Sequence, residues 1–423
     1  MRRNLTEGGV FKNVLLFSLP YLLSYFLQTL YGMADLFIVG QFEGVASTTA
    51  VSIGSQVMHM LTVMIVGLAM GSTVSIGQAV GGGREKRAAR SIGNTATLFM
   101  SLSVLLMAGL LLLVRPIVRV MSTPEAAVSG AEAYLTICFI GIPFITAYNI
   151  SSSIFRGLGD SKSPMYFIAV ACAVNIALDY LFMGALHLGS AGAALGTTLS
   201  QAVSVAVSLI VIRKRNIGVP VALQDGLIQV AFIVITIIAN QRGLTDAAAV
   251  GIVEKVISFL FLVPSSMLST VSALGAQNIG AGKPERTVRT LGYACLLAAG
   301  FGLTVAAALQ FVAEGIVGLF TTDSGAIAAG GQYLRGYIWD CLFAGLHFSF
   351  SGYFCACGKS GLSFLHNIIA IALVRVPGVY LTSRLFPETL LPMGLATAAG
   401  SLLSVVICVV AFAALRRREA AHG

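Results

Sequence analysis

The chain has 423 residues, of which 57% are hydrophobic and only 10% are charged. Soluble domains contain roughly 45–50% apolar and about 25% charged residues, so this composition excludes an ordinary soluble protein and predicts a polytopic membrane protein. The formal net charge of +9 comes from basic residues that lie mostly between apolar segments. We therefore expect this charge to set membrane topology, and we expect no nucleic-acid partner.

Twelve apolar segments reach about the 20 residues that cross a bilayer as a helix. In chain order the predicted spans lie at 14–38, 50–76, 93–114, 132–154, 164–186, 191–212, 217–240, 247–273, 290–312, 333–357, 364–384 and 391–415. The predicted fold class is an all-α integral membrane protein with twelve transmembrane helices, surrounded by the lipid bilayer.

The sequence repeats itself once, at an offset of 199 positions. Gln78, Gly81, Gly83, Arg87 and Arg90 fall on Gln277, Gly280, Gly282, Arg286 and Arg289, and Tyr134, Leu135, Phe155, Gly159 and Ser161 fall on Tyr333, Leu334, Phe354, Gly358 and Ser360. A duplication of membrane-length segments predicts two pseudo-symmetric six-helix bundles around a central cavity, as in secondary transporters that work by alternating access. The expected domains are an N-lobe at 1–212, a short basic linker at 213–216 and a C-lobe with a cytoplasmic tail at 217–423.

The basic residues predict the orientation of the chain in the membrane. With twelve spans both termini lie on one side, and the loops of that side carry nineteen of the 26 Lys and Arg residues. They are Arg2, Arg3, Lys12, Arg84, Lys86, Arg87, Arg90, Arg156, Lys162, Arg213, Lys214, Arg215, Lys283, Arg286, Arg289, Lys359, Arg416, Arg417 and Arg418. The positive-inside rule then makes both termini cytoplasmic in a multi-pass protein of a bacterial-type inner membrane.

Two prolines interrupt predicted spans at equivalent places in the two copies, Pro20 in the first span and Pro220 in the seventh. A proline inside a helix removes a hydrogen bond and clashes with the preceding turn. We expect both helices to bend there, either as a static kink or as a moving joint.

Polar groups at membrane depth are costly and need a reason. In the N-lobe these are Asp35 in the first span, Asn175 and Asp179 on one face of the fifth, and Thr197 in the sixth. Their oxygen atoms can exchange a proton or hold a hard cation such as Na⁺. This group is the candidate coupling site, and the chain offers no other predicted metal site.

The C-lobe holds Glu254 and Lys255 in the eighth span, Asp340 in the tenth and Arg375 in the eleventh. We expect Asp340 and Arg375 to form a buried pair with a mainly structural role, and we keep Glu254, Asp340 and Arg375 as further polar candidates. The histidines at 59, 347 and 366 are isolated in the sequence and lack metal-ligand spacing, so a packing role is favoured for them.

Aromatic, methionine and amide side chains are dense near the predicted cavity. Rings and thioethers suit lipophilic and cationic ligands. The candidate substrate-contacting residues are Gln28, Tyr31, Met33, Met64, Tyr148 and Asn149.

No enzymatic signature occurs in the chain, which lacks a P-loop, a G-x-S-x-G and an H-E-x-x-H motif. We therefore expect a transporter that is not an enzyme, has no cofactor and uses an ion gradient.

Over nearly its whole length the chain resembles the multidrug and toxic compound extrusion (MATE) family. The resemblance rests on Leu19-Pro20, Asp35-Leu-Phe-Ile-Val-Gly40, Asn175 to Asp179, Ala191 to Thr197, and Gln277 to Gly282 with Arg286. Within the family the chain is most similar to the DinF-like branch, whose N-lobe carries the cation site. That resemblance assigns the site to Asp35, Asn175, Asp179 and Thr197, with Pro20 as the bending point.

The resemblance implies an H⁺- or Na⁺-coupled antiporter that exports lipophilic, often cationic compounds. We expect a monomer with no obligatory protein partner. A flippase for lipid-linked saccharides, or another small-metabolite exporter of the same fold, is the alternative. A pyrophosphate-binding flippase needs Lys and Arg at membrane depth, and the N-lobe is expected to have none there. A channel or a membrane sensor is less consistent with two homologous lobes.

Overall fold

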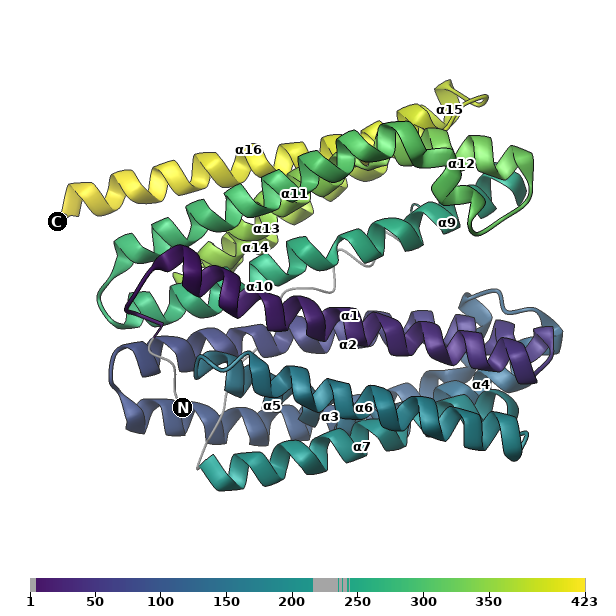
Figure 1. Cartoon of the computed structure of the whole chain (residues 1–423), viewed down its shortest axis with the longest axis horizontal. Helices are drawn as coiled ribbons and strands as arrows, with labels where there is room; N and C mark the ends of the chain where they lie inside the picture. Colours follow the sequence, from purple (N-terminus) through teal and green to yellow (C-terminus); the bar gives the residue numbers. More distant parts are fainter. Residues whose placement is uncertain (1–4, 216–234, 236–237, 239–241, 243, 423) are drawn as a thin grey trace. The chain divides into compact units, whose positions relative to one another are not determined.

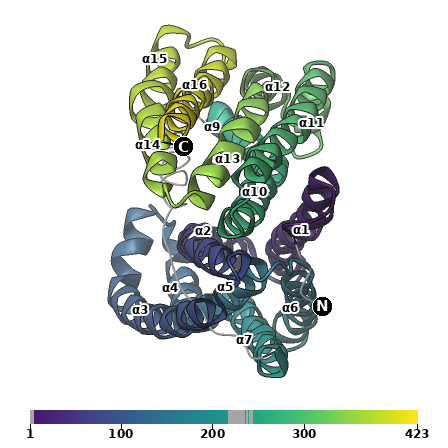
Figure 2. The same cartoon turned by 90° about the vertical axis from the view of Figure 1, so that its left-hand side faces the viewer.

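The structure, a computed structural model, describes residues 5–215, 235, 238, 242 and 244–422. Every regular element in those residues is a helix, and the helices form two compact units (Figures 1 and 2). The N-terminal unit runs from Leu19 through the sixth predicted span, and the C-terminal unit contains Leu5–Ser18 together with the helices after residue 242.

The N-terminal unit contains most of α1 (Val10–Phe42) and the helices that follow it in the chain. These are α2 (Val45–Gly81), α3 (Glu85–Val120), α4 (Glu125–Ile140), α5 (Ile142–Gly157), α6 (Lys162–Asp179), the π-helix η1 (Tyr180–Ala185) and α7 (Gly189–Arg215). Its core packs around Leu135, Phe139 and Ile142, which are fully buried. The predicted linker at 213–216 begins inside α7, and its residue 216 lies outside the described residues.

The C-terminal unit follows the same plan. Its helices are α9 (Leu244–Leu260), α10 (Leu262–Gly280), α11 (Pro284–Gly318), α12 (Ser324–Tyr337), α13 (Trp339–Ala356), α14 (Ser360–Ala370), the π-helix η2 (Ile371–Arg375), α15 (Val376–Leu385) and α16 (Leu391–His422). Tyr333, Tyr337 and Ile338 are fully buried at its centre.

The helices have the lengths and apolar composition that a membrane requires. In the described ranges, nine segments are long and apolar enough to cross it, and α4 with α5, bent by 48°, forms a tenth if the pair is one span. The predicted span at 333–357 coincides with the end of α12 and α13. The predicted span at 217–240, with Pro220, lies almost entirely outside the described residues.

Helix α1 belongs to both units. Its residues up to Ser18 group with the C-terminal unit and those from Leu19 with the N-terminal unit. Pro20 lies just past this boundary, and the hydroxyl of Ser24 donates to the Pro20 carbonyl at 2.8 Å. Proline has no backbone N–H, so α1 lacks one helical hydrogen-bond donor at Pro20, close to the residue at which the helix passes from one unit to the other.

The duplication is visible in the backbone of two pairs of turns. Gly83 and Gly282 adopt φ values of 68° and 71°, and Gly159 and Gly358 adopt 86° and 72°. Glycine is the residue that adopts this left-handed conformation without strain. The same helix-ending turn thus recurs in both units, as the repeated glycines predict.

Close helix contacts in the C-terminal unit depend on glycine. A Cβ atom at Gly336 of α12 would meet the backbone of α16 at Leu391, and one at Gly394 of α16 would meet the backbone of α12 at Tyr333. The two helices therefore pack backbone to backbone, as small residues allow within a membrane.

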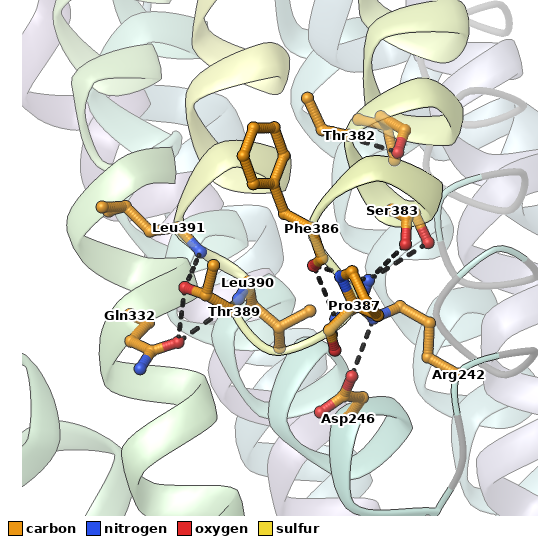
Figure 3. Close-up of polar contacts among 11 residues, drawn as sticks. Arg242, Asp246, Gln332, Thr382, Ser383, Phe386, Pro387, Thr389, Leu390 and Leu391 are labelled. Atoms are coloured by element: carbon orange, nitrogen blue, oxygen red, sulfur yellow. Dashed lines mark hydrogen bonds and ion pairs between the residues drawn. The ribbon is translucent and has the colours of Figure 1, made fainter.

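At one end of the C-terminal unit, the loop between α15 and α16 is held by hydrogen bonds from side chains of other segments (Figure 3). Arg242 pairs with Asp246 at 2.7 Å and donates to the carbonyls of Ser383 at 2.6 Å and Pro387 at 2.8 Å. Gln332 of α12 accepts from Thr389 at 2.8 Å. Together these contacts fix the loop between α15 and α16 to both α9 and α12.

Candidate functional site

The four predicted coupling residues lie in three helices of the N-terminal unit. Asp35 is in α1, Asn175 and Asp179 are in the last two turns of α6, and Thr197 is in α7. All four are buried, with exposures of 2% for Asp35 and 0% for both Asn175 and Asp179. Because Asn175 and Asp179 are four residues apart, α6 presents them on one face.

The structure brings these residues into mutual contact. The hydroxyl of Thr197 donates to Oδ2 of Asp35 at 3.0 Å. The carboxyl groups of Asp35 and Asp179 lie close enough to interact with each other, and the amide of Asn175 lies beside both. Gly196 precedes Thr197 in α7, and its missing side chain leaves the space that the carboxylate of Asp179 occupies.

This group of residues contains polar atoms without partners. Within the described part of the chain, Oδ1 of Asp35, both carboxylate oxygens of Asp179 and both amide atoms of Asn175 are buried, and no residue outside this group donates a hydrogen bond to them or accepts one from them. Leaving such atoms unsatisfied is costly, and two buried carboxylates also repel each other. Oxygen atoms of carboxylate, amide and hydroxyl groups are the ligands that a hard cation prefers. The arrangement therefore fits either a bound proton or a cation such as Na⁺.

Phenol groups lie near the carboxylate of Asp35. Tyr31 and Tyr134 both lie within electrostatic reach of Asp35, and the Tyr134 hydroxyl is hydrogen-bonded to Ser55 at 3.2 Å. Tyr148 lies beside Tyr31, and its own hydroxyl is buried without a hydrogen-bond partner among the described residues.

The predicted substrate-contacting residues differ in exposure. Tyr148 and Asn149 are buried in α5, and Gln28 and Tyr31 are half-buried in α1. Met33 and Met64 are 55% and 42% exposed. Tyr31 and Tyr148 share one packing cluster with Phe155 and Phe167, whereas Met33 and Met64 are outside it.

The π-helix that follows Asp179 was not predicted. It starts at Tyr180, directly after the acid, and changes the helical phase at that point. π-helical turns occur often at functional sites. No residue pattern in the sequence indicated it.

In the C-terminal unit, the expected buried pair is present. Arg375 donates to Asp340 at 3.0 Å and to the hydroxyl of Tyr337 at 2.9 Å, and both charged residues are buried. Glu254 is half-buried and lies within electrostatic reach of Tyr333 and Tyr337.

The structure corrects two expectations. His347 and His366 are not isolated, because their rings lie 5.5 Å apart and His366 contacts Ser351 at 2.9 Å. Arg156, expected in a loop, is a residue of α5 and is only 8% exposed. Both errors have one cause, since contacts between separate helices leave no local pattern in the sequence.

Comparison with known proteins identifies the family. The family model described as MatE matches the chain twice, at residues 20–181 and 220–381. The chain belongs to the MATE family of transporters. The two matches of one model also confirm the predicted duplication.

Curated relatives of this MATE protein include multidrug resistance proteins. It is 28% identical over 392 residues to the probable multidrug resistance protein YpnP of Bacillus subtilis, and the alignment covers 88% of each chain. It is 24% identical over 418 residues to the multidrug export protein MepA of Staphylococcus aureus, covering 90% of this chain and 89% of the relative.

The fold also agrees with that of solved MATE transporters. An outward-facing structure of a multidrug resistance MATE family transporter has a TM-score of 0.87 at 22% identity and covers 99% of this chain and 97% of the other. The predicted fold class, an all-helical membrane protein, is thereby confirmed. The family is one of transporters, so the chain is not expected to have an enzymatic activity.

Proposed function

We propose that this MATE protein is a cation-coupled multidrug antiporter that exports lipophilic, often cationic compounds. The observation that carries the proposal is the group of buried, unpartnered oxygens of Asp35, Asn175 and Asp179. The names of YpnP and MepA support the substrate class.

The coupling ion is a proton or Na⁺. A proton shared between Asp35 and Asp179 would remove one negative charge and supply the missing donor. Na⁺ would instead be coordinated by both carboxylates, the Asn175 carbonyl oxygen and the Thr197 hydroxyl. Either ion neutralises the same buried charge, and therefore both alternatives predict the same essential residues.

Export would follow because the coupling ion and the substrate cannot occupy the site at the same time. A lipophilic cation is attracted to the ionised carboxylates and the phenol rings of Tyr31 and Tyr148. When a proton or Na⁺ arrives, that attraction is lost and the substrate is released. Linkage requires the reverse as well, so that bound substrate weakens the binding of the ion.

Several finer assignments belong to this proposal. We infer an N-lobe at 1–212 with the coupling site, as in the DinF-like branch, a linker at 213–216 and a C-lobe at 217–423. We place both termini in the cytoplasm, because the basic loops lie on their side of the predicted topology. We expect a monomer in a bacterial-type inner membrane, with Pro20 and Pro220 as bending points.

Transport by the purified protein in liposomes tests the proposal. A fluorescent lipophilic cation is followed while either a pH gradient or a Na⁺ gradient is imposed. One gradient should drive movement in the native protein and in Glu125→Gln, which removes an exposed acid of α4. Asp35→Asn should insert normally but transport at least about tenfold more slowly. Full gradient-driven transport by Asp35→Asn would overturn the proposal.

A further inference from the structure

The first described residues, 5–9, form a short segment attached to the C-terminal unit, which we call the N-terminal strap. Arg286 of α11 donates from Nη2 to the carbonyls of Glu7 at 3.1 Å and Gly8 at 3.0 Å. Lys283, the residue before α11 begins, donates to a third carbonyl of the strap at 3.1 Å. Hydrogen bonds with a charged donor are stronger than those between neutral groups, so two cations hold the strap in place.

The strap is also tied to the first turns of α1. The side-chain amide of Asn13 donates to the carbonyls of Leu5 at 3.4 Å and Glu7 at 2.9 Å. Leu5 is fully buried, and the rings of Phe11 in α1 and Tyr293 in α11 meet edge to face with centroids 5.4 Å apart. The strap and the start of α1 are therefore fixed to α11 together.

A buried amide orients Arg286. Asn278, in the last turn of α10, is 1% exposed, and its Nδ2 donates to the Leu274 carbonyl at 2.7 Å. Its Oδ1 accepts from Nε of Arg286 at 3.1 Å. Because the guanidinium is planar, a bond at Nε fixes the direction of the other N–H groups. Asn278 thus directs Nη2 of Arg286 towards the strap.

The N-terminal copy of the same motif lacks this arrangement. At an offset of 199, Arg286 falls on Arg87 and Asn278 falls on Ala79. Alanine offers no side-chain acceptor, and Arg87 is exposed, with no side-chain hydrogen bond or ion pair among the described residues. Both turns nevertheless contain the same left-handed glycine. The turn itself does not need the arginine bonds, so those of Arg286 have a role specific to the C-terminal copy.

Helix α1 connects the strap to the coupling site. It is continuous from Val10 to Phe42, with Asp35 in the N-terminal unit and its residues up to Ser18 in the C-terminal unit. A displacement of Asp35 can therefore reach the C-terminal unit along a single helix, provided that the start of the helix stays attached there. If the start were released, α1 would move with the N-terminal unit alone.

We propose that Arg286, oriented by Asn278, is a positioning residue for ion-coupled transport. It fixes the start of α1 to the C-terminal unit, so that ion binding at Asp35 is transmitted to that unit. Arg286 contacts neither the ion nor the substrate in this scheme and acts only through α1. The transport role rests on the proposed antiport function, whereas the attachment of the strap does not.

Hydrogen–deuterium exchange of the purified protein in detergent tests the attachment without any transport step. In Arg286→Gln the first helical amides of α1, at 13–18, should exchange at least about tenfold faster, because hydrogen bonds to a charged donor are lost. Asn278→Ala introduces the residue of the N-terminal copy and should give a smaller increase. Arg87→Gln, at the equivalent exposed arginine, should exchange like the native protein. Unchanged exchange in Arg286→Gln would overturn the proposal.

A second variant keeps this test decisive if Arg286→Gln does not fold. Lys283→Gln changes an exposed residue and removes only its bond to the strap. The same amides should then exchange faster than in Arg87→Gln. Equal exchange in these two variants would show that the bonds to the strap do not hold α1.

Binding and transport measured together test the positioning role. Arg286→Gln should bind a fluorescent lipophilic cation with native affinity and the native response to the coupling ion, since Asp35 and Asp179 are unchanged. Its gradient-driven transport in liposomes should be at least about tenfold slower, because the displacement of α1 is no longer transmitted. Arg286→Lys keeps the charge without the planar fork and should transport at an intermediate rate. A variant that was merely unstable would lose binding as well.

The outcomes separate this proposal from the antiport function. Native transport by Arg286→Gln, alongside gradient-driven transport by the native protein, would overturn the positioning role alone. Parallel loss of binding and transport in Arg286→Gln would overturn it as well. Absence of gradient-driven transport in the native protein would overturn the antiport function and the positioning role with it, and the exchange experiment would still decide whether Arg286 holds the strap.

Discussion

The hydroxyl of Thr197 donates a hydrogen bond of 3.0 Å to one carboxylate oxygen of Asp35, while the other oxygen of Asp35 is buried without a partner among the described residues. Helix α7 thus holds the acid of α1 in one orientation. The other oxygen, Oδ1 of Asp35, is therefore available to interact with Asp179, Asn175 and the coupling ion.

Thr197→Val should impair coupling without unfolding the protein, because it keeps the shape of the side chain and removes only the hydroxyl. A hydrogen bond to a charged group contributes about 1.5–3 kcal/mol, which corresponds to roughly a tenfold or greater loss of apparent ion affinity. The measurement is the ion concentration that gives half-maximal transport. Thr198→Val is the matched control, since Thr198 contacts the Ile137 carbonyl at 3.5 Å and not a carboxylate. Equal effects of the two substitutions would contradict the role given to Thr197.

Gly196→Ala should disturb the coupling site directly. The new methyl group would overlap the carboxylate of Asp179, which must then leave its present position beside Asp35 and Asn175. We expect initial transport rates to fall at least about tenfold, since small displacements at a functional site have large effects on rate. Gly93→Ala in α3 has open space around it and should transport normally. Normal transport by Gly196→Ala would show that the observed packing is not required.

Asp340→Asn should destabilise the C-terminal unit. Removing one partner of a buried ion pair costs about 3–5 kcal/mol, because the charge of Arg375 remains buried. Thermal unfolding in detergent measures the effect, and the double variant Asp340→Leu/Arg375→Met should recover much of the stability. Glu314→Gln provides the comparison, since its pair with Arg335 is partly exposed and should contribute about 1 kcal/mol or less. An Asp340→Asn protein as stable as Glu314→Gln would disagree with this prediction.

Gly336→Ala should weaken the contact between α12 and α16. The added methyl group would press against the Leu391 carbonyl, and backbone cannot move aside as a side chain can. Overpacking of this kind costs about 1–3 kcal/mol. Thermal unfolding should therefore begin at a lower temperature in Gly336→Ala than in Gly361→Ala, whose methyl group would enter open space. A melting temperature equal to that of the control would show that the helices can separate at little cost.

The helices and the family could be predicted from the sequence because a membrane imposes simple rules. Apolar segments of fixed length must be helices, and a repeated segment must repeat its backbone, as Gly159 and Gly358 show. Asp35 and Asp179 stood out because charge at membrane depth is costly. Their mutual contact could only be expected, since it depends on how α1 and α6 pack.

Other features could not be predicted, since they arise from the packing of separate helices against each other. The approach of His347 to His366 joins α13 to α14, and it has no local signature. Arg156 lies in a run that resembles a polar loop, Arg-Gly-Leu-Gly-Asp, and only the structure shows that its side chain is buried. The assignment of residues up to Ser18 to the C-terminal unit likewise depends on distant contacts, such as the bonds from Arg286 to the carbonyls of Glu7 and Gly8.

The most direct test of the central claim is equilibrium binding of a fluorescent lipophilic cation to the purified protein at a series of pH values and Na⁺ concentrations. If the coupling ion and the substrate exclude each other at Asp35 and Asp179, one of the two ions should raise the apparent Kd at least tenfold in the native protein. The same titration should leave the Kd of Asp179→Asn nearly unchanged. Substrate affinity that is independent of both ions in the native protein would contradict competition at this site.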